Sequence, residues 1–218
     1  MLKAIVFDLD GTLVDSAPDI AWGINRMLAD YSLAARDVRF IERLTGEGAS
    51  VLVAKVYAAI GEDVDEARVE SDTARYLAHY ASRPAAESHL YADAATALPA
   101  LRNAGLCLGV CTNKIQSLAE IVLEALGVRR FIDVVVGSDT TSQRKPHPQP
   151  LLHTLAALGA TADEALFIGD TTIDRDCAAA AGVACRIVDW GTGPLVEMPA
   201  ESRLRRFADL LPDFVPRV

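Results

Sequence analysis

Short apolar runs alternate with helical segments along most of the chain, and this alternation limits the fold more than any other feature. The runs that indicate strands are residues 4–8, 107–112, 133–137, 165–169 and 185–189. Each is almost continuously apolar ("AIVFD", "CLGVCT", "DVVVG", "ALFIG" and "CRIVD"), which is typical of strands buried on both faces. A half-exposed antiparallel sheet would instead alternate apolar and polar residues.

Helical patterns lie between these strands. Residues 93–104, 115–126, 149–158 and 174–181 carry apolar side chains at helical spacing, and each segment ends just before a glycine. Glycine directly after the last turn is the usual stop signal of a helix. Strand and helix in repetition therefore predict an α/β fold, with a parallel sheet and helices on both of its faces.

One segment, from residue 17 to about residue 82, breaks the alternation. Four stretches with helical patterns follow one another there ("PDIAWGINRMLADY", "DVRFIERL", "ASVLVAKVYAAI" and "DEARVESDTARYLAHY") without a convincing strand. We therefore expect a helical insert between the first strand and the rest of the sheet. The expected domains are residues 16–82 for the insert, and residues 1–15 with 83–218 for the sheet.

Composition limits the partners and the cellular compartment. The net charge of −9 and the lack of a basic block argue against a nucleic-acid partner. The nearest basic cluster, "RLRR" at residues 203–206, is expected to be the solvated face of a C-terminal helix. No apolar run reaches the roughly 18 residues of a membrane span, and the N-terminus turns acidic too early for a signal peptide. The four cysteines have neither metal-site nor disulfide-framework spacing, which indicates buried thiols in a reducing cytoplasm.

Polar residues follow the predicted strands at their carboxyl ends, where ligands bind in parallel α/β sheets. In chain order these residues are Asp8 and Asp10, then Thr112 and Asn113, then Lys145, then Asp170 and Asp174. So many acids would repel one another unless a cation neutralised them, and hard oxygen ligands suit Mg²⁺. A divalent ion, a lysine and hydrogen-bond donors around one point make a site for a phosphoryl group. Each residue alone has an ordinary explanation, such as a turn, a helix cap or a surface lysine, so the interpretation depends on their coincidence.

Four motifs together, "DLDGTLVDS", "VCTNK", "RKPHP" and "IGDTTID", resemble those of the haloacid dehalogenase-like superfamily of phosphohydrolases. The longer stretches "DLDGTLVDSAPDI", "TGEGASVLVAKV", "KPHPQPLL" and "GDTTIDRDCAAAAG" are most similar to the phosphoglycolate phosphatase branch. The resemblance implies a Rossmann-like core with an α-helical cap domain inserted after the first motif, in agreement with the insert above. It also implies Mg²⁺-dependent hydrolysis of a small phosphorylated metabolite, with 2-phosphoglycolate favoured, through an aspartyl phosphate.

The resemblance also assigns roles to the residues at the strand ends. Asp8 would be the nucleophile, Asp10 the general acid and base, and Lys145 the partner of the nucleophile and of the transferring group. Thr112 and the backbone around Asn113 would bind the phosphoryl oxygens. The implied metal site comprises Asp8, Asp10 through its backbone carbonyl, Asp170, and Asp174 through a metal-bound water.

Several alternatives stay open at this level. The same core would serve a phosphatase for another small phosphate, a pyrophosphatase or a phosphomutase, because the core residues act only on the phosphoryl group. A receiver-type phospho-aspartate signalling module or a catalytically inactive binding protein would be a different class. Substrate choice is expected to depend on the insert, with Glu47 and the nearby Arg43 as candidates. The chain is expected to be a monomer or a homodimer, and the stretch "WGTGP" at residues 190–194 departs from the ending typical of the family.

Overall fold

The computed structural model describes residues 2–91, 93–192 and 195–213. The chain divides into two compact units, one formed by Ser16–Ser88 and the other by the segments on either side of it. Among the described residues, no helix combines the length and the apolar character that crossing a bilayer requires.

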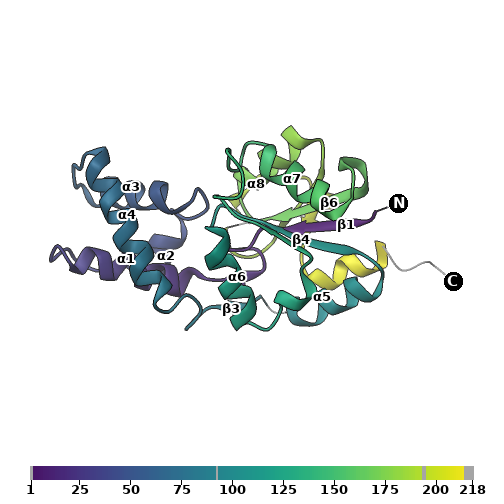
Figure 1. Cartoon of the computed structure of the whole chain (residues 1–218), viewed down its shortest axis with the longest axis horizontal. Coiled ribbons are helices and arrows are strands. Elements are labelled where there is room, and N and C mark those ends of the chain that lie inside the picture. Colours follow the sequence, from purple (N-terminus) through teal and green to yellow (C-terminus); the bar gives the residue numbers. More distant parts are fainter. Residues whose placement is uncertain (1, 92, 193–194, 214–218) are drawn as a thin grey trace. The chain divides into compact units, whose positions relative to one another are not determined.

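The sheet unit is built on six strands in the order β5-β4-β1-β6-β7-β8. The strands are β1 Ala4–Phe7, β4 Cys107–Cys111, β5 Val134–Val136, β6 Ala165–Gly169, β7 Ala184–Val188 and β8 Arg203–Leu204. All their pairings are parallel, and β1 lies between β4 and β6 in the middle of the sheet (Figure 1). The predicted parallel α/β sheet is therefore confirmed.

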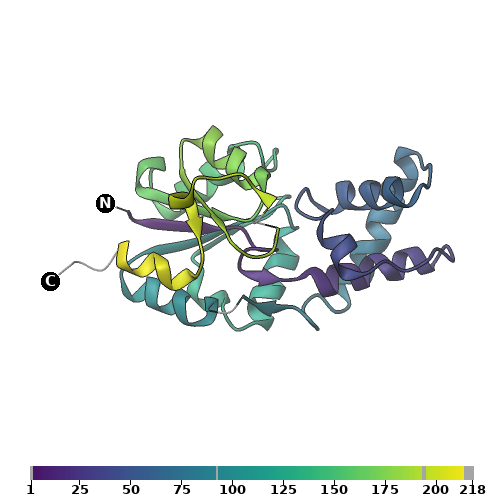
Figure 2. The same ribbon diagram turned by 180° about the vertical axis from the view of Figure 1, so that it is seen from behind.

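Helices cover both faces of this sheet. They are α5 Ala94–Asn103, α6 Gln116–Ala125, α7 Gln149–Leu158 and α8 Thr172–Ala181. Gly159 and Gly182 are left-handed directly after α7 and α8, as expected for helix stops. The helices α7 and α8 lie over one face, and the C-terminal 3₁₀ segment η5, Phe207–Asp213, lies beside α5 on the other (Figure 1 and Figure 2).

Strand β1 contributes to the core on both faces because successive side chains of a strand point in opposite directions. Ala4 and Val6 pack in a buried cluster with Leu155 of α7 and Cys177 of α8. The ring of Phe7 meets an aromatic ring of η5 edge-on, with the two centroids 5.8 Å apart. The central strand is thus enclosed on both sides, which explains its continuous apolar run.

The prediction of a C-terminal helix at residues 203–206 is wrong. Arg203 and Leu204 form the edge strand β8, which pairs in parallel with β7. Leu204 is buried, and Arg203 lies near Asp189 at the end of β7. Two residues are too few to show a strand period in the sequence, so only the pairing with β7 reveals this element. A second short pairing, between β2 Val14–Asp15 and β3 His89–Leu90, was missed for the same reason.

The second unit, Ser16–Ser88, is fully described and contains helices and loops without a strand. Its helices are α1 Ala17–Ala29, α2 Val38–Glu42, α3 Ala49–Ile60 and α4 Glu66–Ala81. The helix α1 packs against α2 and α4, and α3 packs against α4. The expected domain boundary at residue 82 falls on the residue that follows α4, whereas the compact unit continues to Ser88.

A buried carboxylate joins three parts of this helical unit. Asp72 of α4 is fully buried and accepts hydrogen bonds from the hydroxyls of Tyr31 (2.6 Å) and Tyr57 (2.7 Å), and from the guanidinium of Arg68. Burial by itself raises the pKa of Asp72, but these three donors lower the pKa below its ordinary value. The group is therefore charged and saturated with donors, as a buried carboxylate must be.

Candidate active site

Asp8 directly follows β1, at the carboxyl edge of the central strand. Its backbone N–H donates to the carbonyl of Ile168 in β6 at 2.8 Å, so the chain is still held in the sheet at this residue. The side chain is almost fully buried, with 6% of the residue exposed. The Nζ of Lys145 lies 2.8 Å from Asp8 Oδ1, yet within the described part of the chain this oxygen receives no well-aligned hydrogen bond. A buried carboxylate that is compensated by this ion pair and not by aligned hydrogen bonds fits contact with a ligand or a cation.

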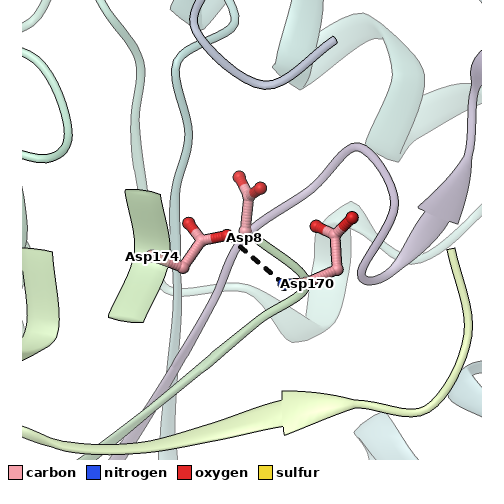
Figure 3. Close-up of side chains that lie close together, drawn as sticks. All are labelled: Asp8, Asp170 and Asp174. Carbon is pink, nitrogen blue, oxygen red and sulfur yellow. Dashed lines mark hydrogen bonds between the residues drawn. The ribbon is translucent and has the colours of Figure 1, made fainter. Parts of the chain in front are cut away.

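Three buried carboxylates meet at this edge (Figure 3). Asp8, Asp170 and Asp174 each offer an oxygen within 4.8 Å of the other two. Burial raises the pKa of Asp8 to about 6, against the opposing charge of Lys145. Burial and the negative charge of Asp174 raise the pKa of Asp170 to about 8. Because the charges are only partly compensated, the donor set suits a divalent cation with hard oxygen ligands.

Asp170 follows β6 and is held from two sides. Its Oδ1 accepts a hydrogen bond from the hydroxyl of Thr12 at 3.0 Å, and its Oδ2 accepts one from the hydroxyl of Thr192 at 2.7 Å. The turn at Gly11 packs its backbone against the same carboxylate. Gly11 has φ +85°, and a Cβ there would lie 2.3 Å from Asp170 Oδ2. Only glycine fits this close approach.

Sequence reasoning missed both hydroxyl donors of Asp170. Thr192 belongs to the "WGTGP" stretch, which departs from the ending typical of the family. Nothing in that stretch indicates that its threonine contacts Asp170. Trp190, in the same stretch, donates its indole N–H to the carbonyl of Thr12 at 3.0 Å. The loop after β7 thus supports the turn that carries the first two acids. Gly193 and Pro194, the end of that stretch, lie outside the described residues.

Asp174 and Lys145 form a buried pair beside Asp8. The Oδ1 of Asp174 lies 2.7 Å from Lys145 Nζ. Its Oδ2 accepts hydrogen bonds from the backbone N–H of Thr171 (3.0 Å) and from its hydroxyl (2.6 Å). Thr171 is the N-cap of α8, and the two residues form a capping box, so Asp174 is the third residue of the helix and not its cap. Burial by itself lowers the pKa of Lys145, but Asp174 and Asp8 raise it well above its ordinary value, which keeps the ammonium charged.

Thr112 and Asn113 lie at the end of β4, as predicted, and both are buried. The side chain of Asn113 donates to the carbonyl of Lys145 at 3.0 Å and accepts from its N–H at 3.0 Å. Asn113 therefore fixes the backbone of the lysine. Neither residue is the N-cap of α6, which is Ile115. The ordinary explanation of the pair as a helix cap is wrong.

The carboxylate of Asp10 is not in the group of three that could hold an ion. Its two carboxylate oxygens accept hydrogen bonds from the Nζ of Lys114 at 2.9 and 3.0 Å. Lys114 belongs to the "VCTNK" motif, but the sequence offered no sign of this contact. The edge of the sheet thus carries two ammonium–carboxylate systems, one around Asp8 and one around Asp10.

Comparisons with known proteins give the family. A model of the haloacid dehalogenase-like hydrolases matches residues 5–188. A phosphoglycolate phosphatase of Rhodospirillum rubrum is 43% identical over 96% of this chain and 90% of its own length. One of Cereibacter sphaeroides is 37% identical over 100% of this chain and 99% of its own. The crystal structure of a predicted phosphoglycolate phosphatase from Haemophilus somnus superposes with a TM-score of 0.85, at 30% identity and with 97% of each chain covered.

The chain belongs to the haloacid dehalogenase-like hydrolase family. The expectation of a phosphoric monoester hydrolase similar to phosphoglycolate phosphatases is thereby confirmed. Membership also removes the receiver-type signalling module as an alternative.

Proposed function

We propose that this chain hydrolyses 2-phosphoglycolate, a small phosphorylated metabolite, by way of an aspartyl phosphate on Asp8, with Mg²⁺ as cofactor. The observation that carries the proposal is the buried Asp8 carboxylate, which lies 2.8 Å from a charged lysine and is grouped with Asp170 and Asp174 so that their oxygens lie within 4.8 Å of one another. The relatives that match nearly the whole chain support the choice of substrate.

The acidic residues of the site fit a divalent ion. Asp8, Asp170 and the backbone carbonyl of Asp10 would hold Mg²⁺, with Asp174 reaching it through a water molecule. When bound, the ion would neutralise negative charge on the phosphoryl oxygens. Both oxygens of Asp174 are already engaged by Lys145 and Thr171, which favours an indirect contact for this residue.

The chain's own side chains would carry the chemistry in two steps. The Asp8 carboxylate attacks phosphorus, the bond from phosphorus to the ester oxygen breaks, and Asp10 protonates the departing alkoxide. A water molecule then gives its proton to Asp10 and attacks the aspartyl phosphate, which releases phosphate and restores Asp8. The ammonium of Lys145 and the hydroxyl of Thr112 offset charge on the transferring group in both steps.

The helical unit Ser16–Ser88 is proposed to be the cap domain, which excludes water and selects the substrate. Arg43 directly follows α2, and Glu47 pairs with Lys55 of α3, so both candidates for substrate choice lie in or beside the loop that joins these helices. A cytoplasmic location remains a prediction, in keeping with four free cysteines.

One assay tests the proposal. Purified protein would be offered 2-phosphoglycolate, sugar phosphates and pyrophosphate, with and without Mg²⁺, and phosphate release would be measured. We expect the highest kcat/KM for 2-phosphoglycolate, only in the presence of the metal. A higher kcat/KM for pyrophosphate, or conversion of a sugar phosphate without phosphate release, would favour the corresponding alternative. No phosphate release from any compound of the panel would contradict the proposed substrate class.

A further inference from the structure

Lys114 is a buried cation at the site that the proposed chemistry does not use. Its side chain is only 7% exposed, and that of Asp10, its partner, is 14% exposed. The Nζ contacts both oxygens of Asp10, at 2.9 and 3.0 Å, although 104 positions separate the two residues in the sequence. Exposed ion pairs of this kind are common and contribute little, but a mostly buried pair costs desolvation and requires a specific geometry.

The backbone of Lys114 is fixed on both sides. Its N–H donates to the hydroxyl of Thr112 at 3.2 Å, and its carbonyl accepts from the N–H of Ser138, which follows β5, at 2.9 Å. The lysine therefore extends from a rigid point at the end of β4. Ordering a long lysine side chain costs conformational entropy, and the contact with both oxygens of Asp10 helps to offset that cost.

The backbone of Asp10 is held by its turn. The N–H of Gly11 donates to the carbonyl of Val14 at 2.9 Å, and the N–H of Leu13 donates to the carbonyl of Leu9 at 3.0 Å. These bonds set the position of the Asp10 Cα but do not by themselves fix the rotation of its carboxylate. A contact from one ammonium to both carboxylate oxygens limits that rotation.

We propose that Lys114 is a positioning residue for proton transfer, which orients the Asp10 carboxylate for the leaving group and for the attacking water. The inference rests on the proposed role of Asp10 as general acid and base. Lys114 contacts both oxygens of Asp10, so its removal should matter most where Asp10 must move a proton. A group that has to donate a proton in the transition state must be held within hydrogen-bond reach of it.

The test compares leaving groups in the first half-reaction. An alkoxide needs a proton as it departs, whereas p-nitrophenolate leaves without one. Single-turnover rates would be measured for the best alkyl phosphomonoester of the panel, and burst rates for p-nitrophenyl phosphate, with wild-type protein and with Lys114→Met. We expect the alkyl rate to fall about 10²-fold, the loss typical of a misplaced catalytic group, while the burst rate stays within about twofold. Lys114→Arg should restore part of the alkyl rate, because it keeps a cation at this position.

A double-mutant cycle with Asp10→Asn separates positioning from a general structural role. In the Asp10→Asn background, Lys114→Met should cause no further loss, because the group it orients is already disabled. Lys3→Met is the matched control, since it removes an exposed lysine paired with Glu164, and it should leave both rates unchanged.

Three outcomes would overturn the inference: equal losses of alkyl and aryl rates, a further loss in the double variant, or a Lys114→Arg variant no better than Lys114→Met. If Asp10→Asn itself left the alkyl rate unchanged, Asp10 would not be the general acid. The positioning role of Lys114 would then be excluded as well. The test uses the best alkyl phosphomonoester of the panel, whichever compound that is. It therefore remains valid even if 2-phosphoglycolate is not a substrate.

Discussion

Thr192→Val removes a single hydroxyl that orients a proposed metal ligand. The hydroxyl donates to Asp170 Oδ2 at 2.7 Å, and valine has nearly the same shape, so the fold should be kept. A hydrogen bond to a charged acceptor contributes about 1.5–3 kcal/mol. Loss of such an outer-shell partner typically costs about 10- to 100-fold in metal affinity, or roughly 1.4–2.8 kcal/mol. Since the two ranges agree, we expect the Kd for Mg²⁺ to rise about 10- to 100-fold.

The loss of Mg²⁺ affinity in Thr192→Val should also depend on pH. Burial already raises the pKa of Asp170 to about 8, and the hydrogen bond from Thr192 opposes that rise. Without the hydroxyl the pKa rises further, so a proton competes more strongly with the metal. The change in Kd should therefore be larger near about pH 7 than near about pH 9, where a larger share of the carboxylate is ionised in both proteins.

Isothermal calorimetry with Mg²⁺ measures both effects without depending on turnover. Thr192→Ser keeps the hydroxyl and should bind nearly as well as the wild type. Thr96→Val is the matched control, because its hydroxyl donates to a backbone carbonyl on an exposed part of α5. An unchanged Kd in Thr192→Val, or an equal rise in Thr96→Val, would refute the reasoning.

The remaining predictions concern the nucleophile, the metal and the helical unit. Asp8→Asn should lose nearly all phosphate release while its thermal unfolding stays cooperative, and a variant with half of the wild-type rate would exclude Asp8 as nucleophile. A chelator should abolish turnover and added Mg²⁺ should restore it, whereas full turnover in chelator would remove the metal from the proposal. Asp72→Ala leaves two tyrosine hydroxyls and an arginine without their buried acceptor, so we expect a loss of about 3 kcal/mol in the free energy of unfolding near neutral pH. The folded pKa of Asp72 is lowered, so its carboxylate stabilises the protein above its unfolded pKa of about 3.9, and the stabilisation is lost as the pH falls through the folded pKa. The difference in the free energy of unfolding between wild type and Asp72→Ala, measured in denaturant titrations, should accordingly become smaller in acid. A difference independent of pH would contradict the charged, buried state assigned to Asp72.

Local patterns were sufficient for most of the fold. The continuous apolar run at residues 4–8 predicted a doubly buried strand, and β1 is enclosed on both faces by the core and by Phe207. Glycines predicted the ends of α7 and α8 because a left-handed residue directly after a helix is a local requirement. The two-residue strands β2, β3 and β8 could not be predicted, because each depends on a partner strand and not on its own sequence.

The candidate site shows the same distinction between local features and features that depend on distant residues. The sequence was sufficient to predict the acids, the lysine and the hydroxyl at the strand ends. A strand end is a local feature, and parallel strands share one edge. What each side chain contacts at that edge was decided by strand order and loop paths. Thr12 contacts Asp170 across 158 positions, and Lys114 contacts Asp10 across 104. No local period encodes such pairs, so the sequence by itself determined the chemical groups of the site, and only the tertiary structure decided which of them hold one another in place.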